Sequence, residues 1–211
     1  MRSRIPARVT AAALVAAALA LSGPGAALRA DARILERLST SSGRPLALAK
    51  PEVTGIENFA EIEPGLARGG RPTAAGIEYL RSSGYRTVVT FLDDAGEREA
   101  LKRAGIECVS IPLRAGPFSA AIPTPEERRR FLEAVSDPSR RPLFFHCKRG
   151  KDRTGAMAAI LRIERDGWTA VEAVQEMRAF GFSAHYKGLL RFVRGYRRGA
   201  VAATPPSPAA P

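Results

Sequence analysis

The sequence predicts an α/β protein in which a central, mostly parallel sheet is flanked by helices. Short apolar and β-branched runs alternate with helical segments, and this alternation favours parallel strands joined by crossover helices. The runs Thr87–Leu92, Ile106–Leu113 and Pro142–Phe145 are typical of strands buried on both faces. The chain has 211 residues, of which 45% are hydrophobic, which suits one domain of ordinary size.

The other elements are expected in order along residues 51–198, the predicted catalytic domain. Gly55–Ala67 predicts a short strand pair, and a helix is expected to open at Pro72-Thr73. Thr124 begins another helix, because it combines an N-cap residue, a proline at the first helical position and a capping box closed by Glu127. The remaining expected helices are Glu97–Ala104, one that starts near Thr154, Ala170–Phe180 and Tyr186–Tyr196.

The segments outside this domain have distinct compositions. Residues 1–30 combine a basic start, the uncharged apolar run Val9–Leu21 and small residues, an order typical of a secretory signal peptide. The apolar run is shorter than the roughly 20 residues that span a membrane, so we expect a secreted or periplasmic protein, with an uncleaved membrane anchor as the alternative. Residues 31–50 are expected to form an N-terminal arm or linker, and residues 199–211 a disordered Ala/Pro tail.

The formal net charge is +12, which favours anionic partners. Phosphorylated substrates, inositol phosphates and anionic membrane surfaces all fit this charge, and a transient contact with a membrane is one expectation. The sequence contains no motif or aromatic platform typical of nucleic-acid binding, so we do not expect nucleic acid as a partner.

The segment from His146 to Gly155, HCKRGKDRTG, carries the predicted chemistry. It follows a buried strand, and ligands of open α/β sheets bind beyond the carboxyl ends of the strands. A glycine-containing turn that leads into a helix offers converging main-chain N–H groups and the positive end of the helix dipole. Such a site binds a phosphate dianion and favours a thiolate, so we predict that Cys147 is a nucleophile.

Neighbouring residues have predicted supporting roles. Arg153 presents a planar set of donors that can bind two phosphoryl oxygens. Gly150 lets the loop curl so that its amides point inward. Thr154 is expected to donate its hydroxyl to the sulfur of Cys147. His146 is expected to hold the loop in place, because adjacent strand residues point to opposite faces of a sheet; a Cys–His ion pair is the alternative.

The loop is strongly basic, with four cations against the single Asp152. This charge suits a substrate that carries several phosphate groups. The alternative is that the basic side chains point to solvent and only favour the thiolate form of Cys147. The sequence leaves both readings open. The residues expected to bind substrate are Lys148, Arg149, Gly150, Lys151 and Gly155.

The pattern C-x-x-G-x-x-R-T-G, preceded by histidine, resembles the signature loop of the protein tyrosine phosphatase superfamily. Asn58-Phe59, Leu66–Pro72 and Gly84–Val89 resemble the opening of its atypical dual-specificity members, so the likeness covers roughly residues 55–180. The resemblance implies the cysteine-phosphatase fold and hydrolysis through a phosphocysteine, with Arg153 stabilising the transition states and with no metal or cofactor.

The resemblance implies phosphotyrosine or dual-specificity protein substrates, phosphoinositides or inositol phosphates. A phosphate-binding module of the same fold that does no catalysis is the alternative function. It is disfavoured because both the cysteine and the arginine of the pattern are present.

The proton donor of the resembled family is usually an aspartate on a separate loop, and this chain departs from that pattern. The matching stretch, Pro112–Pro123, contains no Asp or Glu. Asp152 is the candidate general acid, because the sequence resembles secreted bacterial members whose G-K-D-R-T loop supplies that aspartate. Glu126 is the alternative, although it fits better as a first-turn helix residue. Asp93 and Asp94 are expected to cap a turn.

Residues outside the loop receive less specific predictions. Cys108 is expected to be a packing residue. The alternative is a reversible disulfide with Cys147, which requires the two strands to be neighbours. Arg68 and Arg71 are expected to be exposed loop residues, with contact to the substrate as the alternative.

Overall fold

The structure is a computed structural model, and it describes residues 39–40, 42–50, 53–114 and 122–200. The predicted signal peptide lies outside these residues, as do residues 201–211 of the predicted tail and part of the expected arm. The chain divides into two compact units, Met1–Leu46 and Ala47–Pro211. In the first unit, Ser39 pairs with Pro45 in an isolated antiparallel bridge. The second unit contains the elements described below.

The sheet has five strands in the order β1-β2-β5-β3-β4. β2 pairs with β5, and β3 pairs with β5 and β4, all in parallel, whereas β1 is antiparallel to β2. The predicted mostly parallel sheet is therefore confirmed, with β5 at its centre. The strands are β1 (Ala60–Glu63), β2 (Leu66–Gly70), β3 (Thr87–Thr90), β4 (Glu107–Ser110) and β5 (Leu143–Cys147).

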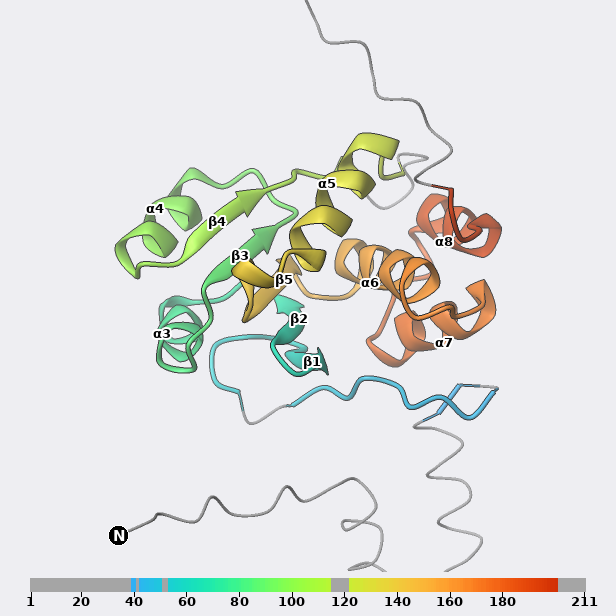
Figure 1. The fold of residues 1–211 in the computed structure, drawn as a ribbon, viewed down its shortest axis with the longest axis horizontal. Helices are drawn as coiled ribbons and strands as arrows, with labels where there is room; N and C mark the ends of the chain where they lie inside the picture. Colours follow the sequence, from blue (N-terminus) through green and yellow to red (C-terminus); the bar gives the residue numbers. More distant parts are fainter. Residues whose placement is uncertain (1–38, 41, 51–52, 115–121, 201–211) are drawn as a thin grey trace, which may run out of the picture. The chain divides into compact units, whose positions relative to one another are not determined.

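Helices lie on both sides of the sheet, with α3 and α4 on one side and α5 to α8 on the other (Figure 1). The expected capping box is present at the start of α5, where the N–H of Glu127 donates to Oγ1 of Thr124 at 3.2 Å. α6 begins at Asp152, two residues before the expected start. The helices are α3 (Ala74–Ser82), α4 (Ala95–Arg103), α5 (Pro125–Ser136), α6 (Asp152–Glu164), α7 (Ala170–Ala179) and α8 (Lys187–Gly195), with a 3₁₀ turn, η1, at Pro138–Arg140.

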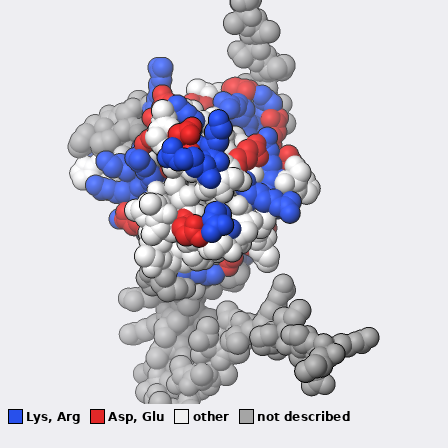
Figure 2. All heavy atoms as spheres, turned by 90° about the vertical axis from the view of Figure 1, so that its left-hand side faces the viewer, with Lys and Arg blue, Asp and Glu red and all other residues white. Residues whose placement is uncertain are grey.

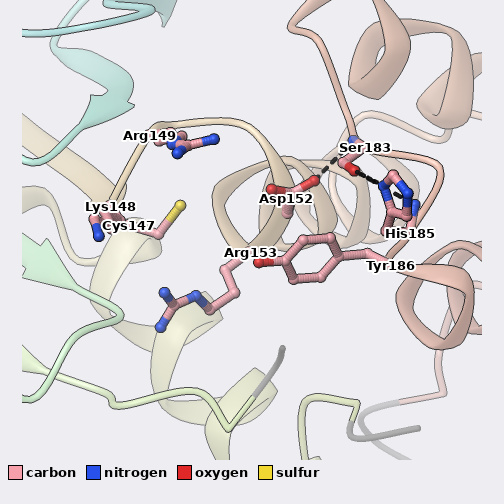
Figure 3. A pocket seen from close by; sticks show the side chains of 8 residues that line it. All are labelled: Cys147, Lys148, Arg149, Asp152, Arg153, Ser183, His185 and Tyr186. Carbon is pink, nitrogen blue, oxygen red and sulfur yellow. Dashed lines mark hydrogen bonds between the residues drawn. The ribbon is translucent and has the colours of Figure 1, made fainter. Parts of the chain in front are cut away.

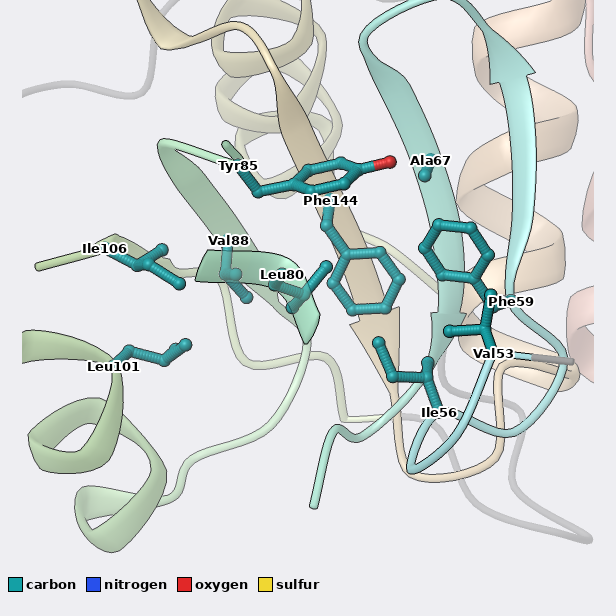
Figure 4. Packing of buried hydrophobic residues seen from close by; sticks show 10 residues of the cluster. All are labelled: Val53, Ile56, Phe59, Ala67, Leu80, Tyr85, Val88, Leu101, Ile106 and Phe144. Atoms are coloured by element: carbon teal, nitrogen blue, oxygen red, sulfur yellow. The ribbon is translucent and has the colours of Figure 1, made fainter. Parts of the chain in front are cut away.

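The central strand β5 joins two apolar layers, because successive side chains point to opposite faces. Phe144 belongs to the cluster beside α3 and α4 and stacks on Phe59, with ring centroids 5.9 Å apart (Figure 4). Phe145 points to the opposite face, where it packs against Phe91 and Phe131. β5 is fully buried, which explains why its sequence is continuously apolar before the loop.

The face covered by α5 to α8 also contains buried charges. Arg162 of α6 binds Glu176 of α7 at 2.9 Å, and both side chains are almost fully buried. Arg68 lies beside them with no exposed surface, so the prediction of an exposed loop residue was wrong. The physical reason is that Arg68 is part of β2, which lies between β1 and β5, and its side chain lies over the ring of Phe180.

The two cysteines lie on strands that are not neighbours, because β3 separates β4 from β5. Cys108 is level with Val88 and Phe144, three residues before Cys147. Strand spacing and rise then place the two Cα atoms about 14 Å apart. A disulfide needs less than about 7 Å, so the alternative of a Cys108–Cys147 bond does not fit this fold. Burial raises the pKa of Cys108 to about 11.

The surface beside α3 and α4 mixes both signs of charge. In Figure 2, Lys and Arg side chains are interspersed with Asp and Glu and with uncharged surface. Ion pairs such as Arg81–Glu78 and Arg98–Asp93 account for part of this mixture. Among the helices that the structure describes, we find none with the length and apolar character that crossing a membrane requires.

Candidate active site

Cys147 is the last residue of β5, at the carboxyl end of the sheet, and the loop after it leads into α6. Its side chain is 3% exposed and lines a pocket with a volume of about 430 Å³ (Figure 3). The remaining lining residues come from the loop, the start of α6 and the turn between α7 and α8; they are Lys148, Arg149, Asp152, Arg153, Ser183, His185 and Tyr186. The thiol therefore lies where a parallel sheet places its ligands.

Donors outside the loop bind its carbonyl groups. The N–H of Arg71 donates to the carbonyl oxygen of Lys148 at 3.3 Å. The side-chain amide of Asn58 donates to the carbonyl oxygen of Arg149 at 3.0 Å. Asn58 itself has a φ of 53°, a left-handed conformation that asparagine tolerates better than most residues. The segments before β1 and after β2 thus hold the first half of the loop.

The middle of the loop is held by the buried guanidinium group of Arg68. Its Nη2 donates to the carbonyl oxygen of Gly150 at 2.7 Å. Gly150 has a φ of 69°, and a Cβ atom there would lie 2.5 Å from the main chain of Gly69. Glycine is required at this position both for its conformation and for the close approach of β2.

With its carbonyl groups bound from outside, the loop keeps its main-chain donors free for a ligand. Within the described part of the chain, no acceptor is bonded to the main-chain N–H groups of residues 148 to 152. These N–H groups lie beside Cys147, at the N-terminus of α6. Unpaired N–H groups at the start of a helix form an anion site, and they stabilise a thiolate as well as a phosphate.

Arg153 lies in the first turn of α6 and carries its guanidinium group below the thiol (Figure 3). Its Nη1 donates to the carbonyl oxygens of Phe91 and Leu113, at 3.2 and 3.4 Å. The edge formed by Nε and Nη2 is therefore the one available for two phosphoryl oxygens.

Three residues of the loop do not have the roles predicted for them. The hydroxyl of Thr154 donates to the carbonyl oxygen of Gly69 at 3.3 Å, and its single proton cannot also serve the sulfur. The side chain of Lys151 forms an ion pair with Glu57 at 3.0 Å and does not line the pocket, so only the main-chain N–H of this residue is left for a ligand. Gly155 is buried inside α6 against Met177.

Other loop residues lie as predicted. Lys148 and Arg149 are exposed and line the pocket, where they can reach an anionic substrate. His146 is fully buried and faces away from the thiol, with Nδ1 3.3 Å from the carbonyl oxygen of Cys147. This geometry fits a residue that holds the loop and does not fit a Cys–His ion pair.

Asp152 faces the pocket from the first turn of α6. Its Oδ1 accepts the main-chain N–H of Ser183 at 2.8 Å, and its other oxygen lies on the side that faces Cys147 (Figure 3). The alternative donors are placed differently. Glu126 is bound by Arg129 on the surface of α5, and Asp94 is the N-cap of α4.

The turn between α7 and α8 supplies pocket residues that sequence reasoning missed. Ser183, His185 and Tyr186 all line the pocket, and none of them was predicted from the sequence to be a site residue. Burial raises the pKa of Tyr186, and the charge of Asp152 raises it further. No motif marks these residues, because their position depends on how α7 and α8 pack against α6.

A buried thiol at the centre of an anion-binding loop, with an arginine in the following helical turn, defines the class of cysteine-dependent phosphatases. Among the described residues, no three His, Cys, Asp or Glu side chains gather as a metal site would require. The chain belongs to the dual-specificity branch of the protein tyrosine phosphatase superfamily. The matching family model, described as DSP-PTPase phosphatase fused to NAD+ kinase, covers residues 52–188.

Named relatives agree with this assignment. The dual specificity protein phosphatase TpbA of Pseudomonas aeruginosa is 32% identical over 166 residues, which cover 79% of this chain and 72% of TpbA. The inositol diphosphatase DSP2 of rice, Oryza sativa subsp. japonica, is 31% identical over 127 residues, which cover 58% of this chain and 61% of DSP2. The chain is a cysteine-dependent phosphatase that acts on phosphate monoesters.

Solved structures share the fold. A crystal structure of P. aeruginosa TpbA in complex with pTyr matches with a TM-score of 0.63 and 29% identity, over 75% of this chain and 97% of that one. The core catalytic domain of the PP-IP phosphatase SIW14 from S. cerevisiae matches with a TM-score of 0.60 over 69% of this chain and 88% of that one. At 22% identity, the second match shows the fold alone.

Proposed function

We propose that the pocket around Cys147 is the active site, with Cys147 as the nucleophile and phosphoproteins as its substrates. The carbonyl groups of the loop are bound from outside, so its N–H groups are left for the phosphate. This single arrangement carries the proposal, because it prepares the site for an anion before any substrate arrives.

The proposed reaction has two steps. The thiolate of Cys147 attacks phosphorus, the P–O bond to the leaving group breaks, and Asp152 donates a proton to the departing oxygen. Water then attacks the phosphocysteine, with the Asp152 carboxylate accepting a proton, and releases phosphate and the free thiolate. The Nε–Nη2 edge of Arg153 binds the equatorial oxygens in both transition states.

Phosphotyrosine in proteins is the preferred substrate class in this proposal. The ring of Tyr186 borders the pocket between Asp152 and Arg153, where it can contact the ring of an aryl phosphate (Figure 3). TpbA, which is similar over most of this chain, is named as a protein phosphatase. Inositol phosphates are the second candidate, because Lys148 and Arg149 add two exposed cations to the same pocket.

Export is also part of the proposal. The basic start and the apolar run Val9–Leu21 support a cleaved signal peptide within residues 1–30. N-terminal sequencing of the mature protein from the periplasm or medium should begin after Ala27 or Ala30. A mature chain that retains the apolar run would contradict this part.

The decisive experiment is hydrolysis of para-nitrophenyl phosphate without added metal by the wild type and by Cys147→Ser. The serine variant is expected to lose activity by about 10⁴-fold or more, as when the nucleophile of another hydrolase is removed. Cys108→Ser is the matched control and should remain active, because Cys108 lies two strands away. Residual activity of Cys147→Ser near the wild-type level would overturn the assignment. A panel of phosphotyrosine peptides and inositol phosphates then separates the two substrate classes.

A further inference from the structure

A buried pair of titratable side chains lies beneath the loop, on the face of the sheet covered by α3 and α4. His146 has no exposed surface, and Glu97 of α4 is 4% exposed. Nε2 of His146 is 3.2 Å from Oε1 of Glu97. The other carboxyl oxygen of Glu97 accepts the hydroxyl of Thr90 at 2.9 Å. The proposed two-step reaction does not use Glu97.

The contacts of His146 indicate where its ring hydrogen lies. Nδ1 is 3.3 Å from the carbonyl oxygen of Cys147, which can only accept, so Nδ1 is assigned the hydrogen. In a neutral ring, Nε2 is then an acceptor. Among the described residues, neither Nε2 nor Oε1 of Glu97 has another hydrogen-bond partner. Two facing lone pairs are costly in a buried site, so a proton must lie between these atoms.

Burial affects both groups in the same sense. It lowers the pKa of His146 to about 4 and raises the pKa of Glu97. Both shifts favour the uncharged forms, a neutral imidazole and a protonated carboxyl group. A protonated Glu97 can donate from Oε1 to Nε2, which supplies the missing hydrogen.

Groups from several elements face Glu97 and modulate its ionisation. The hydroxyl of Thr90 lowers its pKa, as do two arginines, whereas a neighbouring aspartate raises it. These charged neighbours are Arg71, Asp94 and Arg98. The charge of Glu97 also acts on Cys108 of β4, where it raises the pKa of the thiol.

We propose that Glu97 is a positioning residue for the phosphatase reaction, whose carboxyl group holds a proton against His146 and so fixes the main chain of Cys147. The inference rests on the proposed role of Cys147. When Glu97 releases this proton to solvent at higher pH, a negative charge is left in a buried site next to His146. That charge weakens the contact and disfavours the neighbouring thiolate. The activity therefore declines on the alkaline side.

The test compares pH profiles of kcat/KM for Glu97→Gln, Glu97→Leu and the wild type. The substrate is para-nitrophenyl phosphate, whose leaving group departs without needing a proton. The amide of glutamine can donate to Nε2 at every pH, so the glutamine variant should keep near-neutral activity within about threefold and lose the alkaline decline. The leucine variant should lose about tenfold or more at every pH. Glu99→Gln, an exposed residue of the same helix, is the matched control.

Thr90→Val provides an independent measurement if Glu97 variants fail to fold. Removing the hydroxyl deletes a hydrogen bond that lowers the pKa of Glu97, so the alkaline decline should move to higher pH. The pH dependence of Cys147 alkylation by iodoacetamide should rank the variants and the wild type in the same order as their alkaline declines in activity. A wild-type profile in both Glu97→Gln and Thr90→Val, or equal losses in the glutamine and leucine variants, would overturn the inference. The role of Cys147 would stand in that case, because Cys147→Ser tests it separately.

Discussion

On the face of the sheet covered by α3 and α4, the loop rests on His146 and Glu97, two side chains that burial drives toward uncharged forms. On the opposite face, it rests on Arg68, whose positive charge lies near the buried pair of Arg162 and Glu176. Both faces are buried, and both use polar side chains to hold carbonyl groups of the same loop.

The difference follows from what each face places around the polar group. Burial lowers the pKa of Arg68 to about 10, and the charges of Glu176 and Cys147 act in the opposite direction. Arg68 therefore stays charged at neutral pH. Its Nε and Nη1 have no hydrogen-bond partner among the described residues, but the ring of Phe180 lies 3.9 Å from Cζ. A charge is retained where an opposite charge and an aromatic face lie close.

Among variants that keep the nucleophile, the largest expected effect comes from Asp152, which the turn between α7 and α8 anchors in the pocket. Asp152→Asn should lower kcat for phenyl phosphate by about 10² to 10⁴-fold, because asparagine cannot donate the proton that this poor leaving group needs. The loss should be much smaller for para-nitrophenyl phosphate. Steady-state kinetics with both substrates measure these losses. Equal turnover of phenyl phosphate by the wild type and by Asp152→Asn would exclude Asp152 as the proton donor.

The next largest effect is expected from the loss of Arg68, the charged side chain that supports the loop. Arg68→Met leaves the carbonyl group of Gly150 without its buried donor and should lower kcat/KM by about 10²-fold, as a misplaced loop does. It should also lower the free energy of unfolding by about 1–3 kcal/mol, because it leaves the buried carbonyl oxygen of Gly150 without its donor. Kinetics and urea denaturation measure the two losses. Arg178→Met, an exposed position on α7, should show neither.

A smaller effect on activity is expected on the face covered by α3 and α4. It distinguishes a residue that only packs in the core from one that positions the loop. Leu101 is fully buried in α4, one helical turn after Glu97, and belongs to the apolar cluster of Figure 4. Leu101→Ala should lower the free energy of unfolding by about 2–5 kcal/mol, because it leaves a cavity. Its kcat/KM per folded molecule should stay within about twofold of the wild type. A large loss of activity in the folded variant would show that packing and positioning are not separable in α4.

The smallest expected effect is on the pH dependence of stability. The folded-state pKa of Glu97 is raised above 4.5, so the folded protein holds a proton that the unfolded chain has lost. This contribution is present at low pH and disappears as pH rises through the folded pKa. Thermal unfolding should therefore show Glu97→Gln gaining a few degrees on the wild type as pH rises. A constant difference across pH would contradict the proton held by Glu97.

Local patterns were sufficient for much of the site. The strand, loop and helix around Cys147 were predicted because a buried apolar run, a glycine turn and a helix start lie next to one another in the chain. The position of Gly150 followed from the same local geometry. The side-chain roles of Thr154 and Lys151 were misassigned, because their partners come from a distant part of the chain. Gly69 lies in β2, which pairs with β5, and Glu57 lies in the segment before β1.

The sequence by itself determined the class of the fold and the order of donors along the loop, because strand burial, helix caps and turn residues act over a few neighbouring positions. Tertiary structure alone decided which groups outside the loop hold it. Arg68, Asn58 and Glu97 reach it from β2, from the segment before β1 and from α4. The pairing of strands and the packing of helices set these contacts, and neither depends on spacing within the loop.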